Sequence, residues 1–224
     1  NTMENFTINS VRDFISILDE RNIKPDIDFF RGHSDINYKL IPSIGRLFPK
    51  DLERTKDFEQ DMMSEFRRMH TLHVDRCNNE FELLFLAQHH GLPTRLLDWS
   101  YNPLVALYFA VCSNYDKDGC VYQYFPSRMI FADNRNPYTI ESNFLIKPII
   151  TNERYKNQNS VFIIYANPTE EESDVYAKYR IQAAYKKHIL MSLRKIGISH
   201  SFIYPTLEGL CKDIKLTKLN LWRI

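Results

Sequence analysis

Apolar residues recur at intervals of three and four along several stretches of the chain, the spacing of an amphipathic helix. Phe14 and Leu18 follow Ser10 in this way, which predicts a helix with Ser10 as its N-cap. Asn102 and Pro103 predict another start, because Asn caps helices well and Pro loses no hydrogen bond at the first helical position. Helices are predicted over residues 51–73 (one or two helices), 80–90, 103–112, 186–196 and 206–214.

Short runs rich in β-branched and aromatic residues lie between these helices and indicate strands. The runs cover residues 28–31, 120–125, 161–165 and 198–203. They do not alternate with helices in the strict order of a parallel sheet. The sequence therefore predicts an α+β fold, a single compact domain in which helices flank a mixed sheet. We expect an N-terminal helical element over residues 1–27, the main domain over 28–216 and a C-terminal strand or tail over 217–224.

Composition and charge narrow the classes of function. Of the 224 residues, 44% are hydrophobic and 13% aromatic, with only 6 Gly and 10 Pro, which excludes a disordered or low-complexity chain. Because 29 Lys and Arg oppose 28 Asp and Glu, the net charge is +1. This balance argues against a broad surface for duplex nucleic acid or an anionic membrane.

The cysteines and the apolar runs predict the compartment. The four cysteines form no Cys-x-x-Cys pair, so we interpret them as free, buried thiols in a reducing environment. The longest apolar run, residues 104–112, is far shorter than the roughly 20 residues of a membrane-spanning helix. Residues 1–10 lack the pattern of a signal peptide. We therefore expect a cytoplasmic protein without membrane contact.

The first of three polar clusters follows Phe30. Arg31 stands at the end of a predicted strand and directly before Gly32. An Arg in that place can present its rigid guanidinium group to a carboxylate or a phosphate. The alternative is a structural ion pair with an acid such as Asp98.

The second cluster, residues 88–100, places two His, a Thr, an Arg, an Asp, a Trp and a Ser between two apolar helices. Each buried polar group without a partner costs roughly 1–3 kcal/mol, so this density indicates a binding site or a hydrogen-bond network. Adjacent His89 and His90 cannot both face one pocket from a helix. No carboxylate stands at metal-ligand spacing and no Gly-x-Ser-x-Gly motif is present, so we expect neither a metal site nor a serine hydrolase.

The other polar stretches are interpreted as surface. Residues 154–158 form the third cluster, which we interpret as a polar loop before a strand. We interpret the acidic residues 170–172 as an exposed turn. Lys186 and its basic neighbours are expected on the solvent-facing side of an amphipathic helix.

Several blocks of the chain resemble the FRG domain family. The blocks are the triplet Phe30-Arg31-Gly32, residues 38–46, residues 88–111 (QHHGLPTRLLDWSYNPLVALYFAV) and residues 187–214. Arg154, Gln158 and Phe162 fit a further block of the family. Tyr155 and Ser160 stand where that block usually has Ile and Gly. The resemblance extends over nearly the whole chain.

More distantly, the sequence resembles the ADP-ribosyltransferases, which split NAD. Those enzymes have an aromatic-Arg-Gly motif on their first strand, and the likeness implies an ADP-ribosyltransferase-like fold with NAD as substrate. It makes Arg31 a catalytic and binding residue, beside Gly32 and His33. Gln158 stands where those enzymes have a catalytic Glu, and an amide brings no negative charge. Asp98 would then supply the missing charge as a catalytic residue.

The same resemblance gives roles to the remaining polar residues. His89, or His90 in its place, would contact the nicotinamide or a ribose hydroxyl during catalysis. The other expected binding residues are Tyr38 and Trp99 as stacking faces, Thr94 and Arg95 at the loop or the pyrophosphate, and Ser100.

Three functions remain open from the sequence. The first is an enzyme that cleaves the N-glycosidic bond of NAD and passes ADP-ribose to a protein, a nucleic acid or water. The second is a non-catalytic module that binds or senses a nucleotide in a bacterial or phage conflict system. The third is a nucleic-acid-directed protein, supported only by the mixed aromatic and basic residues 122–128.

Overall fold

The computed structural model describes residues 3–24, 26–72, 77, 79–126, 129–131, 135–148 and 153–219. The helices in these residues are α1 (Val11–Glu20), α2 (Leu52–Met69), α3 (Glu80–His89), α4 (Pro103–Val111), α5 (Glu153–Gln158), α6 (Ala183–Lys195), α7 (His200–Ile203) and α8 (Leu207–Lys218). The strands are β1 (Glu4–Ile8), β2 (Phe29–His33), β3 (Leu96–Ser100), β4 (Gly119–Tyr124), β5 (Met129–Phe131), β6 (Phe144–Lys147), β7 (Ser160–Ile164) and β8 (Val175–Ile181). Short 3-10 turns lie at Ile44–Arg46 and His70–Leu72.

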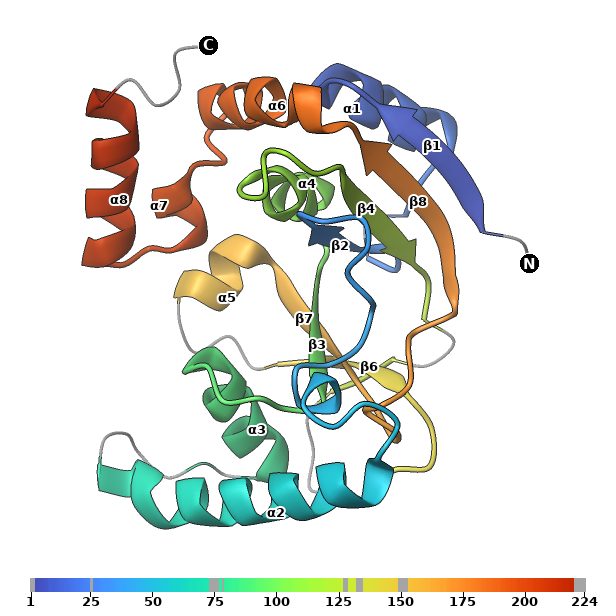
Figure 1. The fold of residues 1–224 in the computed structure, drawn as a ribbon, viewed down its shortest axis with the longest axis vertical. Helices are drawn as coiled ribbons and strands as arrows, with labels where there is room; N and C mark the ends of the chain where they lie inside the picture. Colours follow the sequence, from blue (N-terminus) through green and yellow to red (C-terminus); the bar gives the residue numbers. More distant parts are fainter. Residues whose placement is uncertain are drawn as a thin grey trace.

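The described strands form one mixed sheet in the order β1-β8-β4-β2-β3-β7-β6-β5. β1 runs parallel to β8 and β5 runs parallel to β6, while the other neighbours are antiparallel. Helices surround this sheet (Figure 1). The predicted fold class, a single compact α+β domain with a mixed sheet flanked by helices, is therefore confirmed.

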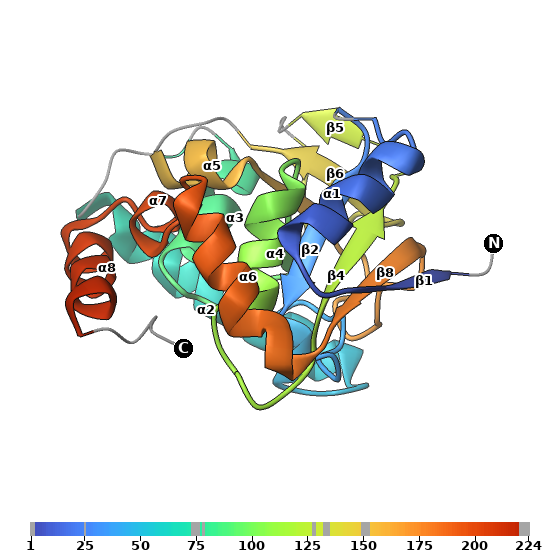
Figure 2. The ribbon, with the colours of Figure 1, turned by 90° about the horizontal axis from the view of Figure 1, so that it is seen from above.

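The sheet divides between β2 and β3 into two halves that have different helices (Figures 1 and 2). On the half made of β1, β8, β4 and β2, helices α1, α4 and α6 enclose one hydrophobic core. On the half made of β3, β7, β6 and β5, helices α2 and α3 enclose a second core. A third apolar cluster contains Phe29, Trp99 and Tyr165, and it joins the two halves.

The predicted helix starts are confirmed at their caps. Ser10 Oγ accepts a hydrogen bond from the Asp13 amide at 3.0 Å, and α1 begins at the next residue. Asn102 Oδ1 accepts from the Leu104 amide at 2.9 Å, and Pro103 is the first residue of α4. Most of α4 is buried, as its apolar sequence predicts. Neither α4 nor any other helix in the described ranges is long and apolar enough to cross a membrane.

α4 packs directly on β2 because Gly32 has no side chain. A Cβ atom on Gly32 would lie 1.8 Å from the Ala106 carbonyl oxygen and 2.7 Å from the Ala110 nitrogen. On the next strand, a Cβ on Gly119 would lie 2.3 Å from the Ala110 carbonyl oxygen. Both distances are far below van der Waals contact, so the two glycines allow the central helix to touch the sheet. This packing fixes the position of Arg31, the residue before Gly32, relative to α4.

Two segments differ from the predicted secondary structure. The strand predicted over residues 198–203 is wrong, because Ser199 Oγ caps the Phe202 amide at 3.2 Å and starts the short helix α7. The polar loop predicted over residues 154–158 is helical and belongs to α5. In both places a short run of residues has little intrinsic preference, and contacts between α5 and α7 help to decide the conformation.

Lys186 corrects the prediction of a solvent-facing side on α6. Its side chain is fully buried (0% exposed). Its Nζ donates to the backbone carbonyl oxygens of Ser34, Ser113, Asn114 and Lys117 at 2.7–3.1 Å. Burial lowers the pKa of this ammonium group. Lys186 therefore ties α6 to the loops that follow β2 and α4.

Two further predictions of exposure and burial are corrected. Glu172 was predicted in an exposed turn, but it is buried and accepts a hydrogen bond from the Tyr165 hydroxyl at 3.1 Å. The cysteines are free, as predicted, but Cys120 is buried whereas Cys211 on α8 is exposed.

The stretch that favoured nucleic acid is largely a buried strand. Tyr122 and Tyr124 belong to β4, and both side chains are buried. Phe125 is 51% exposed, and residues 127 and 128 lie outside the described part of the chain. The described residues of this stretch therefore do not form the aromatic and basic surface that was considered.

The terminal segments add to the same fold. Residues 4–8, for which no strand is predicted, form β1 and pair with β8 at the edge of the sheet. At the other end α8 continues to Lys218, into the segment expected as a strand or tail. Residues 220–224 of that segment lie outside the described residues.

Candidate functional site

The sheet opens between β2 and β3. Phe30 and Ser100 are the one pair of residues in register across these two strands. Beyond this pair Arg31 bridges the gap, because its Nη1 donates to the Asp98 carbonyl oxygen at 2.6 Å. A side chain thus satisfies a backbone acceptor that a continuous sheet would satisfy with an amide.

A cleft of about 190 Å³ lies at this opening, between β2, β3, α4 and α5. Its polar lining consists of Arg31, Asp98, Ser100, Arg154, Gln158 and Ser160, and its apolar lining includes Phe30, Val105 and Phe109. The volume is below the roughly 300 Å³ at which typical small-molecule pockets begin. The cleft therefore has room for one part of a larger ligand.

Arg31 is held in one orientation by its neighbours. Its Nε donates to Nε2 of His33 at 3.0 Å. Nε2 must then be unprotonated, so neutral His33 has its proton on Nδ1 and donates it to the Tyr38 carbonyl oxygen at 3.1 Å. Burial lowers the pKa of the Arg31 guanidinium group, and the nearby Asp98 carboxylate opposes that effect. His33 and Tyr38 thus position Arg31 from behind the cleft.

His33 makes the stability of the protein sensitive to acid. Burial, and then the charge of Arg31, lower the pKa of His33 from 6.5 to about 3. Between these two values the unfolded chain binds a proton at this residue and the folded protein does not, so stability falls as the pH falls. We expect this residue to account for a loss of about 2 kcal/mol in the free energy of unfolding between pH 7 and pH 5.

Urea unfolding of the wild type and of His33→Gln at both pH values measures this contribution. The variant should lose less stability over the interval, because its amide does not titrate. An equal loss in both proteins would contradict the assigned pKa shift.

Asp98 is the acidic group of the cleft. Its side chain is 55% exposed, and Oδ2 lies 3.9 Å from Nη1 of Arg31. The same oxygen accepts from Nε2 of Gln88 at 2.9 Å, and Oε1 of Gln88 accepts from the Thr94 hydroxyl at 2.5 Å. Oδ1 of Asp98 makes no hydrogen bond with any described residue. Arg31 therefore makes the ion pair with Asp98 that was considered as the alternative, and it also lines the cleft.

Helix α5 brings Arg154 and Gln158 to the same cleft. They are four residues apart and so lie on one face of the helix. The Arg154 guanidinium group lies 5.3 Å from the centre of the Tyr204 ring, and Nε2 of Gln158 donates to the Ile203 carbonyl oxygen at 2.9 Å. The Ser100 hydroxyl donates to the Gln158 carbonyl oxygen at 2.6 Å, which joins α5 to β3.

The structure brings together about half of the predicted site residues. Those that line the cleft are Arg31, Gly32, Asp98, Trp99, Ser100 and Gln158. Those that do not line it are His33, Tyr38, His89, Thr94 and Arg95. Arg154 and Phe109 line the cleft without having been singled out for the site. The four-residue spacing of Arg154 and Gln158 indicates a shared helix face only after α5 is known to be a helix.

The aromatic residues expected to stack on a ligand are already packed. Trp99 is 2% exposed, and its ring lies 5.3 Å from that of Tyr124. The Tyr38 side chain is exposed, but its hydroxyl accepts from Nδ2 of Asn114 outside the cleft. Phe109 on α4 is the aromatic side chain at the cleft that is neither buried nor part of the sheet.

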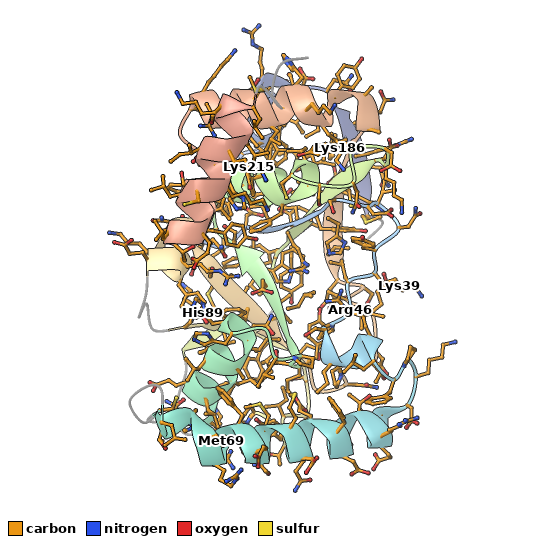
Figure 3. All side chains as sticks on the ribbon, turned by 60° about the vertical axis from the view of Figure 1, so that its left-hand side comes forward. Lys39, Arg46, Met69, His89, Lys186 and Lys215 are labelled. Carbon is orange, nitrogen blue, oxygen red and sulfur yellow. The ribbon has the colours of Figure 1, made fainter. Side chains whose placement is uncertain are left out.

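His89 lies at the end of α3, next to the cleft but not in its lining (Figure 3). Its carbonyl oxygen accepts from Nη1 of Arg154 at 3.4 Å, and its ring packs edge-on against Tyr155. Burial, and then Arg154, lower the pKa of His89. In this arrangement His89 positions Arg154 through its backbone.

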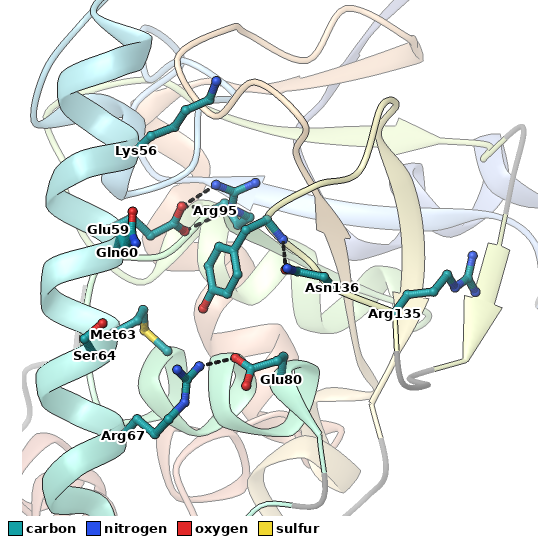
Figure 4. A pocket seen from close by; sticks show the side chains of 11 residues that line it. Lys56, Glu59, Gln60, Met63, Ser64, Arg67, Glu80, Arg95, Arg135 and Asn136 are labelled. Atoms are coloured by element: carbon teal, nitrogen blue, oxygen red, sulfur yellow. Dashed lines mark hydrogen bonds and ion pairs between the residues drawn. The ribbon is translucent and has the colours of Figure 1, made fainter.

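Arg95 faces a different cavity, of about 520 Å³, between α2, the start of α3 and residues 135–138 (Figure 4). It forms a buried ion pair with Glu59, the two side chains being 2% and 1% exposed. Nη1 of Arg95 also donates to the carbonyl oxygens of Pro137 and Tyr165 at 3.2 and 3.4 Å. All of these Arg95 donors bond to acceptors inside the protein, so Arg95 holds the segment at Pro137 and the end of β7 in place.

Within the described ranges, no group of three or more His, Cys, Asp or Glu side chains is placed to hold a metal ion. The polar groups that line the cleft are two guanidinium groups, one carboxylate, one side-chain amide and two hydroxyls.

Residues 27–119 match the family model of the FRG domain. This segment runs from just before β2 to the start of β4, and it includes Arg31, Asp98 and α4. No curated protein and no solved structure matches the chain.

Proposed function

From the FRG domain that the chain has at residues 27–119, and from the cleft that its strands open, we propose that the protein binds NAD or a related nucleotide and cleaves its N-glycosidic bond. The observation that supports this most is the place of Asp98. Its half-exposed carboxylate stands in the same cleft as the guanidinium groups of Arg31 and Arg154. One negative charge among two positive charges suits a ligand that combines phosphates with a developing cation.

Cleavage of this bond needs negative charge beside the ribose. As the bond between the ribose carbon and the base nitrogen breaks, its electron pair leaves with the base, and the ribose becomes an oxocarbenium-like cation. The Asp98 carboxylate would stabilise that cation. Water or an acceptor group on a protein or nucleic acid then bonds to the carbon and loses its proton to the solvent. Arg154 would bind a phosphate, and Gln158 would offer its amide oxygen to a hydroxyl.

The size of the cleft limits which part of the ligand enters it. About 190 Å³ has room for the base or the ribose at the bond that breaks, but not for a whole dinucleotide. The second nucleoside would lie outside the cleft, beyond the phosphates. Arg154 on α5 lines the same cleft and would bind these phosphates.

The function is tested by incubating the purified protein with NAD and measuring free nicotinamide by chromatography. We expect the wild type to release nicotinamide and Asp98→Asn to release it at least 100-fold more slowly, because the amide has no charge. Asp57→Asn, an exposed acid on α2 away from the cleft, is the matched control and should be unchanged. No release by the wild type, or equal rates for wild type and Asp98→Asn, would contradict the proposal.

A second candidate is a non-catalytic module that binds the same nucleotide. It is favoured by Gln158, an amide at the place where the ADP-ribosyltransferases have a catalytic Glu, and by the hydrogen bond from Gln88 that already occupies Asp98 Oδ2. NAD would then raise the melting temperature of the protein without any release of nicotinamide. The two measurements together separate an enzyme from a sensor in the bacterial or phage conflict system considered from the sequence.

A further inference from the structure

A further cavity, separate from the cleft and from the cavity beside Arg95, lies between the end of α4, the middle of α6, α7 and α8. Its volume is about 500 Å³, more than twice that of the cleft. This volume is within the range of roughly 300–1,000 Å³ that is common for small-molecule sites. The proposed cleavage reaction makes no use of it.

Aromatic rings line this cavity from several elements. They are Tyr108 on α4, Tyr115 in the loop after α4, His200 on α7 and Tyr204 directly after α7. The rings of His200 and Tyr204 lie 4.8 Å apart with an angle of 43° between their planes. Leu190 on α6 and Leu216 on α8 add apolar surface. Such a lining favours a flat, apolar ring that can stack on aromatic side chains.

The lining has little net charge. Its charged members are Glu208 and Lys212, two exposed residues of α8 that have opposite signs. The lining therefore offers no excess charge for a phosphate, in contrast to the cleft with its two guanidinium groups. An uncharged ligand suits this cavity better than an anion.

Hydrogen-bonding atoms accompany the aromatic rings. The Tyr108 hydroxyl and Nδ1 of His200 form a hydrogen bond of 2.8 Å. Nε2 of His200 makes no hydrogen bond with the described residues. The Thr206 hydroxyl accepts from the Gly209 amide at 3.0 Å, which holds the start of α8 against the cavity. His200 can thus bond to a ring nitrogen or an exocyclic amino group of a ligand.

We infer that this cavity is a second binding site, and that it takes an uncharged nitrogen heterocycle of the size of a purine nucleoside. The ring of Tyr115 would stack on the base, beside Tyr204. Nε2 of His200 would hydrogen-bond to its edge, and the open side toward α8 would receive the ribose.

Tyr204 and α7 connect this site to the cleft. The Arg154 guanidinium group lies 5.3 Å from the centre of the Tyr204 ring. The side-chain amides of Asn157 and Gln158 donate to the carbonyl oxygens of Phe202 and Ile203, each at 2.9 Å. A ligand that fixes α7 and Tyr204 therefore also fixes the helix that brings Arg154 and Gln158 to the cleft. This coupling rests on the proposed function, whereas binding in the cavity does not.

Binding is tested by calorimetric titration of the full chain with adenosine and guanosine, with ribose as the control that lacks a base. We expect at least one of the two nucleosides to bind and ribose not to bind. Leu216→Trp fills the cavity and should weaken nucleoside binding at least tenfold. Leu210→Trp places the same ring on the exposed side of α8 and should leave binding unchanged.

A second variant keeps the test decisive if Leu216→Trp does not fold. Tyr115 is 41% exposed and removing its ring opens no core, so Tyr115→Ala should fold and should weaken binding at least threefold. If neither nucleoside binds, or if both cavity variants bind like the wild type, the inference is wrong. Displacement of the nucleoside by NAD with one-to-one competition would also overturn it, because the two sites would then be one.

The coupling is tested by titrating NAD with and without saturating nucleoside. We expect the nucleoside to change the affinity for NAD at least threefold in the wild type, and less in Asn157→Ala, which lacks one bond between α5 and α7. An unchanged affinity for NAD would overturn the coupling alone. Absence of NAD binding would contradict the proposed function, and the nucleoside titration would still decide whether the second site exists.

Discussion

Gly32→Ala is expected to lower the free energy of unfolding by more than about 3 kcal/mol. The added Cβ would lie 1.8 Å from the Ala106 carbonyl oxygen and 2.7 Å from the Ala110 nitrogen. Both atoms belong to the backbone of α4, the central helix, so no flexible side chain can move aside. The helix must shift away from β2, and that shift disturbs a core on one side and the cleft on the other. Urea unfolding, followed by circular dichroism, measures the loss.

Gly91→Ala is the matched control for this prediction. Gly91 has a positive φ of +92°, and a Cβ there would meet no atom within 4 Å. Its substitution should cost about 1–2 kcal/mol, through backbone strain alone. A stability of Gly32→Ala within 1 kcal/mol of the wild type would show that α4 can move away from the strand at little cost.

The triplet Phe30-Arg31-Gly32 therefore combines three physical roles in consecutive residues. Phe30 is buried in the core beneath α4, and Gly32 lets the backbone of α4 reach the strand. Arg31, between them, points away from that contact and into the opening of the sheet. Gly32 was expected to bind the ligand, and the structure gives it a packing role that places Arg31.

Local patterns in the sequence predict the elements whose cause is local. The caps at Ser10 and Asn102 and the apolar run of α4 need no distant partner, and the structure has these helices where the pattern places them. The strand β1 has no comparable signal, because its partner β8 lies about 170 residues further along the chain. The conformation of α7 depends on one serine cap that competes with a β-branched pattern.

The candidate site, like the secondary structure, was predictable only where its cause is local in the sequence. Arg31 and Asp98 stand out in the sequence, because a charge between apolar residues requires a partner. Their meeting at one opening depends on which strands are neighbours in the sheet, and no local pattern contains that information. Lys186 shows this limit of sequence-based prediction most clearly. Helical periodicity predicts it on the surface, but in the structure it is buried and donates to four backbone carbonyl oxygens.

Glu59→Gln is expected to destabilise the protein by about 3–5 kcal/mol. The substitution leaves the Arg95 guanidinium group buried without a countercharge, although the side chain keeps its size. Arg95 cannot turn toward solvent, because it also donates to the carbonyl oxygens of Pro137 and Tyr165. The Arg95 guanidinium group also lies over the Tyr138 ring, 5.1 Å from its centre, and this contact helps to hold the side chain in place. The loss would therefore appear as lower stability of the half of the protein that contains α2 and β3.

A double-mutant cycle shows whether the pair itself, rather than either residue, is the cause. Arg95→Met in the background of Glu59→Gln removes the unpaired charge, so it should recover part of the stability that Glu59→Gln loses. Glu65→Gln on the same helix breaks an exposed ion pair with Arg68 and should cost less than about 1 kcal/mol. Equal losses for Glu59→Gln and Glu65→Gln in urea unfolding would mean that water reaches Arg95 through the cavity beside α2. In that case Arg95 would be available to a ligand from that side, and its assignment to the scaffold would fail.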